Sequence, residues 1–397
     1  MPGPCPALTF TMSESFLPLQ QPMDSIPAEI RCAQDYELLA QRFMAPASYA
    51  YVAGGSGRDA TVEANRAAFD SWAVYPRLLR DVSGAHARVT IGGQELSHPI
   101  MLAPVAFQKL AHPRGELETA RAAAALQTCM VSSTLASYTL EEIAAAGAFP
   151  RWFQLYFQPT REGTLDLLRR AEGAGYGAIM VTLDASIQVA SLRALRANFQ
   201  MPPDCIAANL RDHAAPEVKE TVAGDSRIFQ GVMRTAPTWR DLEWLMTQTA
   251  LPIWVKGVLH PQDACALQSR GVAGIVVSNH GGRSLDGAPA SLQVLPAIRA
   301  AVGEDFPLLF DSGIRSGLDI FKALALGANA VMIGRLQMYA LSVAGALGVA
   351  HMIRLLQEEL EVCMAQAGCV TVTEIDRATV AATAAAKPGS AGNLELP

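Results

Sequence analysis

A histidine and an arginine lie three residues apart in a glycine-rich turn, His280 and Arg283 of the segment 278–283, SNHGGR. The turn follows a short apolar run, 274–277, with the composition of a buried strand. An imidazole can accept a proton near neutral pH, and a guanidinium can bind a carboxylate through two parallel hydrogen bonds. An isolated H-x-x-R is more often a loop with a polar histidine and a solvated arginine. Together the two side chains would suit proton abstraction from a substrate that carries a carboxylate.

Composition and charge are those of a soluble globular enzyme. Half of the 397 residues are apolar and 17% are charged. The net charge of −6 and the lack of a basic run argue against a nucleic-acid partner. No uninterrupted apolar stretch approaches the length of a membrane span, so no membrane partner is expected. Seven dispersed cysteines without a C-x-x-C spacing favour free thiols in the cytoplasm and predict no metal site.

The chain divides into three predicted parts. Residues 1–30 are rich in Pro and Ser and are expected to form a flexible leader, residues 31–380 a single domain, and residues 381–397 a C-terminal tail. Within the domain, residues 35–52 have helical spacing and predict an N-terminal helical segment.

From about residue 96 onward, short apolar runs alternate with alanine-rich helical stretches, the pattern of repeated strand–helix units. The runs that we expect to be strands are 100–103, 130–132, 152–155, 179–183, 252–255, 274–277, 307–310 and 330–333. Helix-length segments separate most of them, for example 115–126, 161–174 and 317–326. Eight such units predict an α/β fold, a (β/α)8 TIM barrel. An open, doubly wound sheet would usually carry G-x-G-x-x-G after an early strand, and this sequence lacks it there.

One long gap interrupts the alternation after the fourth apolar run. It spans about residues 185–250 and contains Pro202, Pro203 and many polar residues. A long excursion on the catalytic face of a barrel is commonly functional. We therefore predict a lid over the substrate site.

Polar side chains follow most of the predicted strands, and in a TIM barrel these strand ends form the active site. They are Ser133, Gln154, Tyr156, Thr182, Asp184, Lys256, Ser278, His280, Asp311, Arg315 and Arg335. Each one alone would more often be a strand cap or a loop hydrogen bond. Taken together they predict a polar pocket at one mouth of the barrel.

The last two strand ends indicate a phosphate site, because loops there usually cradle phosphate in this fold and helix N-termini favour anions. Either Arg315 or Arg335 would supply the fixed positive charge. Lys256, at the end of an apolar strand, needs an anionic partner if it is buried, and the edge of a reduced flavin is a good candidate. The residues alone predict a phosphate-bearing cofactor and a carboxylate substrate.

Several motifs give the chain a family resemblance. They are SNHGGR at 278–283, EANR at 63–66, AHP at 111–113, FQLY at 153–156, LPI and VKG within 251–257, and FKALALGA at 321–328. With these motifs the chain resembles the FMN-dependent 2-hydroxy acid oxidases and dehydrogenases, the family of glycolate oxidase, lactate oxidase and mandelate dehydrogenase. The resemblance spans about residues 35–375.

The resemblance implies a set of catalytic and substrate-binding residues. His280 would be the base and Asp184 its partner, because an anion beside the imidazolium stabilises the proton once it arrives. Arg283 and Tyr51 would hold the substrate carboxylate, and Tyr156 would contact the hydroxyl oxygen. Whether His280 removes the α-proton or the hydroxyl proton, with hydride passing to the flavin, stays open.

The resemblance also implies FMN as the cofactor. Lys256 would sit near the pyrimidine edge of the flavin. The residues that would line the flavin ring are Ala106, Ser133, Gln154, Thr182 and Ser278. Those that would cradle ribityl and phosphate are Asp311, Gly313, Arg315, Gly334 and Arg335.

The chain departs from its relatives at several of these positions. Ser191 stands where many of them carry a second active-site arginine, and Arg193 is a candidate replacement in the substrate site. Leu135 aligns with an aromatic residue that closes the pocket in glycolate oxidase. Ser312 stands in a frequent Asp-Gly-Gly sequence, so it replaces a glycine. Ser284 and Leu336 replace a usual glutamine and proline.

We therefore expect FMN-dependent oxidation of an L-2-hydroxy acid to a 2-oxo acid. The loss of a cation at Ser191 and of an aromatic at Leu135 favours a medium-chain or aryl acid. Ala106 favours oxygen as the acceptor, with hydrogen peroxide as the product. The alternatives are a dehydrogenase that passes electrons to a quinone or protein acceptor, a type 2 isopentenyl diphosphate isomerase, and a catalytically impaired flavoprotein with a binding role. A homo-oligomer, tetramer or octamer, is expected.

Overall fold

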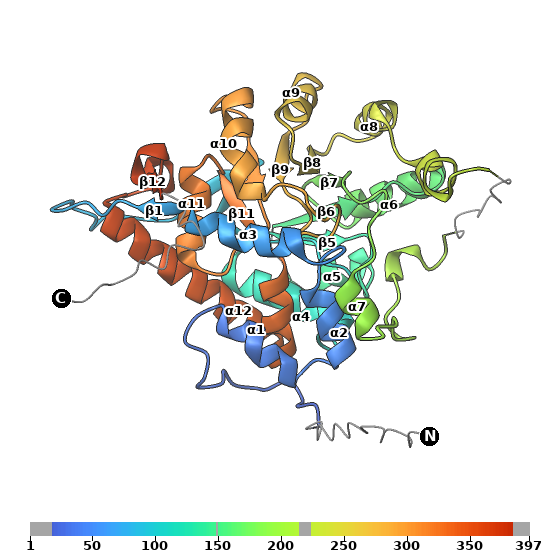
Figure 1. Ribbon diagram of the computed structural model, residues 1–397, viewed down its shortest axis with the longest axis horizontal. Helices are drawn as coiled ribbons and strands as arrows, with labels where there is room; N and C mark the ends of the chain where they lie inside the picture. The colour runs from blue at the N-terminus through green and yellow to red at the C-terminus, as the bar shows by residue number, and fades with distance from the viewer. Residues whose placement is uncertain (1–17, 148–149, 214–223, 384–397) are drawn as a thin grey trace, which may run out of the picture.

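A computed structural model describes residues 18–147, 150–213 and 224–383 (Figure 1). Eight parallel strands form a closed barrel in the order β10-β11-β4-β5-β6-β7-β8-β9. They are β4 (Ile100–Leu102), β5 (Met130–Ser133), β6 (Arg151–Leu155), β7 (Ile179–Thr182), β8 (Ile253–Val258), β9 (Gly274–Val277), β10 (Leu308–Phe310) and β11 (Ala330–Ile333). All eight predicted strands are present, and the predicted TIM barrel is confirmed.

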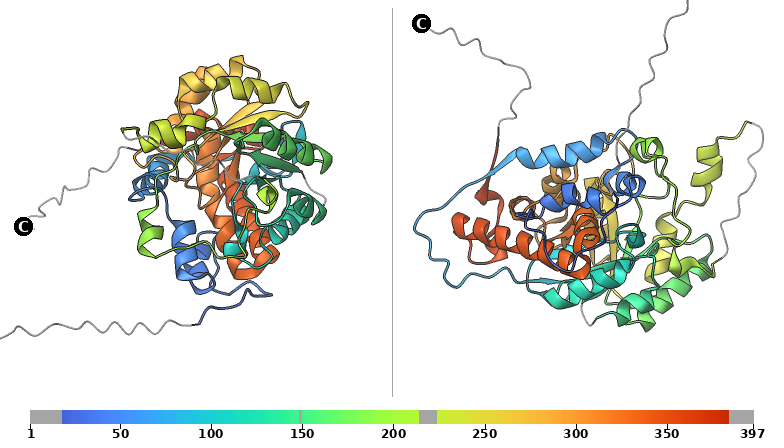
Figure 2. Two further views of the ribbon diagram at one scale, coloured as in Figure 1. Left: turned by 90° about the vertical axis from the view of Figure 1, so that its right-hand side faces the viewer. Right: turned by 90° about the horizontal axis from the view of Figure 1, so that it is seen from below.

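A helix follows each strand and packs outside the barrel (Figures 1 and 2). These helices are α4 (Gly115–Leu126), α5 (Leu140–Ala145), α6 (Arg161–Gly173), α8 (Trp239–Met246), α9 (Pro261–Ser269), α10 (Ser291–Val302), α11 (Gly317–Ala325) and α12 (Arg335–Ala367). Capping residues in the local sequence determine where several of these helices begin. Thr139 and Glu142 form a capping box at α5, and Ser316 and Asp319 form one at α11.

The barrel interior is filled with side chains. Successive residues of a strand point to opposite faces, so Met101 packs in the interior cluster while Ile100 and Leu102 pack under the helices. Trp152 and Trp254 meet in the interior with ring centroids 4.8 Å apart. The hairpin of β2 (Val89–Ile91) and β3 (Gln94–Leu96) contributes Ile91 and Leu96 to the same cluster. The interior is therefore a packed core, and ligands must bind at a mouth.

The N-terminal segment contains α1 (Asp35–Leu39), the 3-10 turn η1 (Ala40–Arg42), α2 (Pro46–Ala53) and α3 (Ala60–Asp70). The helical segment predicted for residues 35–52 is thus two helices with a break between them. Part of the predicted leader, within residues 18–30, makes contacts with the domain. Gln20 N donates to Arg42 O at 2.9 Å, and Met23 N donates to Val343 O at 2.8 Å. Residues 1–17 lie outside the described residues.

The far end of the chain also joins the fold. β12 (Val380–Ala382) pairs antiparallel with β1 (Trp72–Val74), so the predicted tail begins inside a strand. Residues 384–397 of that tail lie outside the described residues. α12 is long and apolar enough to cross a membrane, but 67% of its most apolar window is buried. It packs against α4 and α11, as a core helix does.

The excursion after β7 covers the range for which a lid is predicted, and is called the lid segment below. It contains α7 (Leu192–Arg196), short turns η3 (Ala208–Leu210), η4 (Arg227–Gly231) and η5 (Val232–Thr235), and residues 214–223 outside the described part. α8, within the predicted lid range, instead belongs to the ring of barrel helices. Its Trp244 ring lies 4.7 Å from the Arg161 guanidinium of α6, and its Glu243 pairs with Arg270 beyond α9. The excursion therefore ends near residue 238 rather than 250.

Candidate active site

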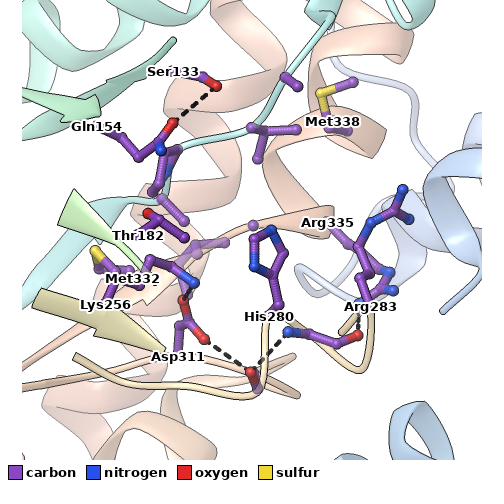
Figure 3. A pocket seen from close by; sticks show the side chains of 18 of the residues that line it. Ser133, Gln154, Thr182, Lys256, His280, Arg283, Asp311, Met332, Arg335 and Met338 are labelled. Carbon is purple, nitrogen blue, oxygen red and sulfur yellow. Dashed lines mark hydrogen bonds and ion pairs between the residues drawn. The ribbon is translucent and has the colours of Figure 1, made fainter. Parts of the chain in front are cut away.

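A pocket opens at the carboxyl ends of the barrel strands (Figure 3). Most of the predicted site residues line it, namely Tyr51, Ala106, Ser133, Leu135, Gln154, Tyr156, Thr182, Lys256, His280, Arg283, Asp311, Gly313, Arg315, Gly334 and Arg335. Asp184 and Ser278 do not line it but contact residues that do. The fold thus gathers side chains from strand ends, from α2 and from the start of α12 at one mouth.

Asp184 binds the imidazole of His280 through the ring nitrogen Nδ1. The imidazole Nδ1 and Asp184 Oδ1 are 2.8 Å apart, and the side chains are 20% and 11% exposed. Burial acts to raise the pKa of Asp184, but the His280 imidazole and the Lys256 ammonium lower it below its usual value. An ionised Asp184 accepts from Nδ1–H, which leaves Nε2 of a neutral His280 as the proton acceptor. The pair is therefore arranged as a general base and its stabilising anion.

A glycine makes room for this pair. Gly257 follows Lys256 in β8 and has a φ of +99°. A Cβ atom at this position would lie 2.4 Å from Cβ and Cγ of Asp184. Any side chain here would displace Asp184 from His280, so the glycine of the VKG motif protects the geometry of the base.

Lys256 is buried in an ion pair next to the base. Its ammonium lies 3.0 Å from Asp311 Oδ2, with the two side chains 5% and 9% exposed. Lys256 Nζ also donates to Ser278 Oγ at 2.8 Å, and the same oxygen accepts from the His280 backbone N–H at 3.0 Å. The anionic partner that burial of Lys256 requires is, in the protein itself, the Asp311 carboxylate. The contacts with Asp311 and Ser278 fix the lysine beside the catalytic loop.

Arg283 is braced by the C-terminal end of α2. Its Nη1 donates to the carbonyls of Tyr51 and Gly54, each at 2.8 Å, and its guanidinium lies 4.8 Å from the Tyr51 ring centroid. The Tyr51 ring stacks in turn on Phe199 of the lid segment at 4.3 Å. Both hydrogen bonds to described residues leave from Nη1, so Nε and Nη2 face no such partner. They can bind a carboxylate, as predicted for this residue.

Tyr156 supplies a hydroxyl at the same pocket. Burial raises its pKa, and the negative charge of Asp184 acts in the same direction. The phenol therefore stays protonated at neutral pH and is able to donate a hydrogen bond.

The catalytic loop is fastened to α3 by an amide pair that sequence reasoning missed. Asn65 Nδ2 donates to Asn279 Oδ1 at 2.9 Å, and Asn279 Nδ2 donates back to Asn65 Oδ1 at 2.7 Å. Both asparagines are 2% exposed. Asp286 adds a second link by accepting from the backbone N–H groups of Arg58 and Thr61. Both asparagines belong to motifs noted above, but no local signal pairs positions so far apart.

Two buried polar groups on one side of the pocket have no partner among the described residues. They are Gln154 Nε2 and Thr182 Oγ1. Ser133 Oγ donates to Gln154 Oε1 at 3.2 Å, which leaves the Nε2 donors of that amide for a ligand. Figure 3 shows Gln154 and Thr182 on one side of His280, with Arg283 and Arg335 on the other. Buried donors are normally satisfied, so these two fit a bound group with polar edges, such as the pyrimidine ring of FMN.

The two arginines predicted to bind phosphate already contact protein acceptors. Arg315 Nε pairs with Glu37 of α1 at 2.7 Å. Arg335 donates to the carbonyls of Val52, Gly54 and Gly281 at 3.0, 2.8 and 2.7 Å. Burial, with the positive charge of Arg283 in addition, lowers the pKa of Arg335 to about 10. The structure brings both cations to the pocket wall, and both also tie the N-terminal helices to it.

The lid segment departs from prediction at Arg193. Arg193 pairs with Asp59 at 2.7 Å and does not line the pocket, so the structure does not bring it together with the other predicted substrate residues. Ser191 Oγ caps α7 by accepting from Ala194 N at 3.3 Å. Gln188, which sequence reasoning missed, is the lid residue that lines the pocket within the described part of the chain. The lid therefore contributes a neutral amide to the pocket.

Known proteins match the chain over most of its length. Residues 40–382 match the family described as FMN-dependent dehydrogenase. An L-lactate oxidase of Alicycliphilus denitrificans is 62% identical over 359 residues, covering 90% of this chain and 98% of that protein. Glycolate oxidase 1 of Zea mays is 39% identical, covering 88% and 95%. A solved structure of mandelate oxidase with (S)-2-phenylpropionate superposes with a TM-score of 0.80 at 40% identity, covering 89% and 98%.

Proposed function

Because the chain belongs to the FMN-dependent dehydrogenase family and is similar to the 2-hydroxy acid oxidases within it, we propose that it oxidises L-2-hydroxy acids with an apolar group on the α-carbon. Oxygen would accept the electrons and hydrogen peroxide would be the second product. The observation that carries this proposal is the placement of the His280–Asp184 pair beside Arg283 in one pocket. A base and a carboxylate anchor are the two groups that the reaction requires from the protein.

FMN fits the residues that line the pocket. Gln154 and Thr182 would hold the polar edge of its ring, Lys256 would stabilise negative charge on it, and Arg315 and Arg335 would bind its phosphate. When bound, FMN supplies the acceptor for the two electrons that leave the substrate. The side chains of this chain supply binding, orientation and proton transfer.

Proton transfer falls to His280. Nε2 takes the proton, and the adjacent Asp184 carboxylate stabilises the imidazolium that forms. Arg283 and Tyr51 bind the substrate carboxylate, and this anchors the α-carbon near the base. Tyr156 donates to the hydroxyl oxygen of the substrate. The same base serves removal of the proton from the α-carbon and from the hydroxyl group.

The described part of the pocket wall favours a substrate with an apolar substituent. Leu135 gives the pocket an apolar wall, and Gln188 lines it with an uncharged amide. Arg193 forms an ion pair with Asp59 and does not line the pocket. An apolar wall stabilises a substrate by about 0.8 kcal/mol for each buried methylene. These features support a medium-chain or aryl acid, and mandelate oxidase is among the similar structures. The name of the 62% identical relative supports L-lactate, the smallest acid of the proposed class.

Oxygen as the acceptor rests on Ala106 in the pocket wall and on the oxidase names of the relatives. A dehydrogenase that uses a quinone or protein acceptor is the competing proposal. The cytoplasmic location and the homo-oligomeric state stay predictions.

The test mixes the holoenzyme anaerobically with glycolate, L-lactate, L-2-hydroxyoctanoate and (S)-mandelate and follows bleaching of the flavin absorbance band. We expect glycolate to be the slowest by about tenfold or more in kcat/KM. If glycolate reacts fastest, the apolar pocket is refuted. If no acid bleaches the band, the chain is a flavoprotein without this activity. An oxygen electrode then separates oxidase from dehydrogenase, since only the oxidase consumes oxygen at the rate of substrate turnover.

A further inference from the structure

The Ser312 hydroxyl bridges the catalytic loop and the buried ion pair. Gly281 N donates to Ser312 Oγ at 3.1 Å, and Ser312 Oγ donates to Asp311 Oδ1 at 2.8 Å. The direction is fixed, because a backbone N–H can only donate and an ionised carboxylate can only accept. Ser312 is 8% exposed, so both hydrogen bonds lie away from bulk water.

Ser312 completes a ring of polar contacts around the base. Asp311 Oδ2 binds Lys256 at 3.0 Å, and Lys256 Nζ donates to Ser278 Oγ at 2.8 Å. Ser278 Oγ accepts from His280 N, while Ser312 Oγ accepts from the next amide, Gly281 N. The backbone N–H groups of His280 and Gly281 are thus linked to the Lys256–Asp311 ion pair. The first is linked to Lys256 through the Ser278 hydroxyl, and the second to Asp311 through the Ser312 hydroxyl. Figure 3 shows the Lys256 ammonium pointing toward the Asp311 carboxylate, with His280 beside them.

The backbone at Ser312 is unfavourable for a serine. Its φ is +90°, in the region that favours glycine. A glycine would adopt this conformation without strain. A non-glycine residue in such a conformation persists when its surroundings hold it, and such residues cluster at functional sites. The Ser312 hydroxyl makes two hydrogen bonds that a glycine could not make, and these hold the serine in this conformation.

We propose that Ser312 is a positioning residue that sets how much of the Lys256 charge is available to the flavin. Its hydrogen bond to Asp311 spreads the negative charge of that carboxylate and weakens its hold on Lys256. Lys256 then retains more of its positive field for the reduced, anionic cofactor. The effect is strong because the pair is buried, where charges are poorly screened. The proposal deepens the proposed function and rests on its placement of Lys256 beside the flavin.

The test measures the two-electron midpoint potential of bound FMN by spectroelectrochemical titration of the holoenzyme. The variants are Ser312→Ala and Ser312→Gly, which both remove the hydroxyl. We expect the flavin reduction equilibrium to fall about tenfold in each, a midpoint potential lower by about 30 mV. Thermal stability should separate them, because glycine accepts a φ of +90° freely and alanine does not. Ser312→Gly should melt at or above the parent temperature and Ser312→Ala below it.

Ser342→Ala is the matched control. Its hydroxyl is also buried and donates to Tyr339 O within α12, outside the polar ring. This variant should keep the parent potential. Parent potentials in both Ser312 variants would overturn the proposal, even if turnover changed. The titration needs no substrate, so lowered potentials in an enzyme that no 2-hydroxy acid reduces would support Ser312 and refute the proposed function instead.

Discussion

Glu37 of α1 binds Arg315 of the loop after β10, with Oε2 and Nε 2.7 Å apart. Burial acts to raise the pKa of Glu37, but the Arg315 guanidinium lowers it, so the carboxylate stays ionised. A buried cation at the proposed phosphate site is thereby neutralised by the first helix of the fold. With FMN bound as proposed, its phosphate and Glu37 would be two anions that face one arginine.

Removal of Glu37 should make the protein depend more on its cofactor. We expect Glu37→Gln to destabilise the cofactor-free protein by roughly 3 kcal/mol, because Arg315 would be left buried and unpaired. FMN should restore much of this loss, since its phosphate replaces the missing anion. Thermal unfolding with and without FMN measures both effects. An FMN-induced rise in Tm equal to that of the parent would mean that Arg315 does not meet the phosphate.

Loss of the base should slow flavin reduction without releasing the cofactor. We expect His280→Ala to reduce the anaerobic rate of flavin reduction by about 10²-fold or more. FMN should remain bound, which the ratio of flavin to protein absorbance checks. His260→Ala is a control, because its exposed imidazole caps α9 and does not line the pocket. Reduction of the His280 variant at the parent rate would remove this residue from the chemistry.

The carboxylate anchor should act on every substrate alike. Arg283→Met removes a charged hydrogen-bond donor that is worth about 1.5–3 kcal/mol. We therefore expect kcat/KM to fall by at least about tenfold for short, medium-chain and aryl acids. Steady-state kinetics across the panel tests this. A loss confined to acids with long tails would place Arg283 near the tail rather than the carboxylate.

Arg193 should be dispensable for substrate binding. Its partner is Asp59, and its own side chain is 48% exposed. We expect Arg193→Ala to leave KM for glycolate and L-lactate unchanged. It should destabilise the protein by more than the loss of an exposed ion pair does, because the Asp59 side chain is 8% exposed and loses this partner. KM values and urea unfolding provide the measurements. A sharp rise in KM for the small acids would show that Arg193 moves into the pocket, and the apolar pocket would have to be abandoned.

His98 should make the protein sensitive to acid. Burial lowers its pKa to about 4, below the usual 6.5. The unfolded chain therefore binds more protons, so this contribution to stability is lost as the pH falls from about 6.5 to about 4. Between pH 7 and pH 5 the parent should lose roughly 2 kcal/mol more than His98→Gln. Urea unfolding at the two pH values measures the difference, and equal losses would contradict the prediction.

The barrel and most of its pocket could be predicted because their signals are local. Each buried strand is a short apolar run, and the polar residues that follow it fall at one mouth once the strands are parallel. The partners of those residues could not be predicted in the same way. Asn65 and Asn279 are 214 positions apart, and Glu37 and Arg315 are 278 apart. Only the closed barrel brings such positions together.

Arg193 shows that residues adjacent in sequence can also be placed wrongly by a prediction from sequence. Its position next to Ser191 predicts a cation in the pocket, since the two residues are neighbours in sequence. Ser191 instead begins α7 as its cap, and the helix carries Arg193 toward Asp59. Gln188, three residues before the cap, takes the place at the pocket wall. A short helix in a long connection decides which side chain points inward, and its start depends on packing that the sequence does not reveal.

The reciprocal amide pair of Asn65 and Asn279 also bears on the order of events during biosynthesis. The hydrogen bonds between Asn65 of α3 and Asn279 can form only after the ribosome has synthesised the catalytic loop. Arg335, which donates to Gly281 O, is synthesised later. A nascent chain that has emerged only through β8 therefore contains the barrel half that carries Gln154 and Thr182 but no phosphate cradle. We expect FMN to be captured after translation ends, and a stalled or truncated chain to remain colourless.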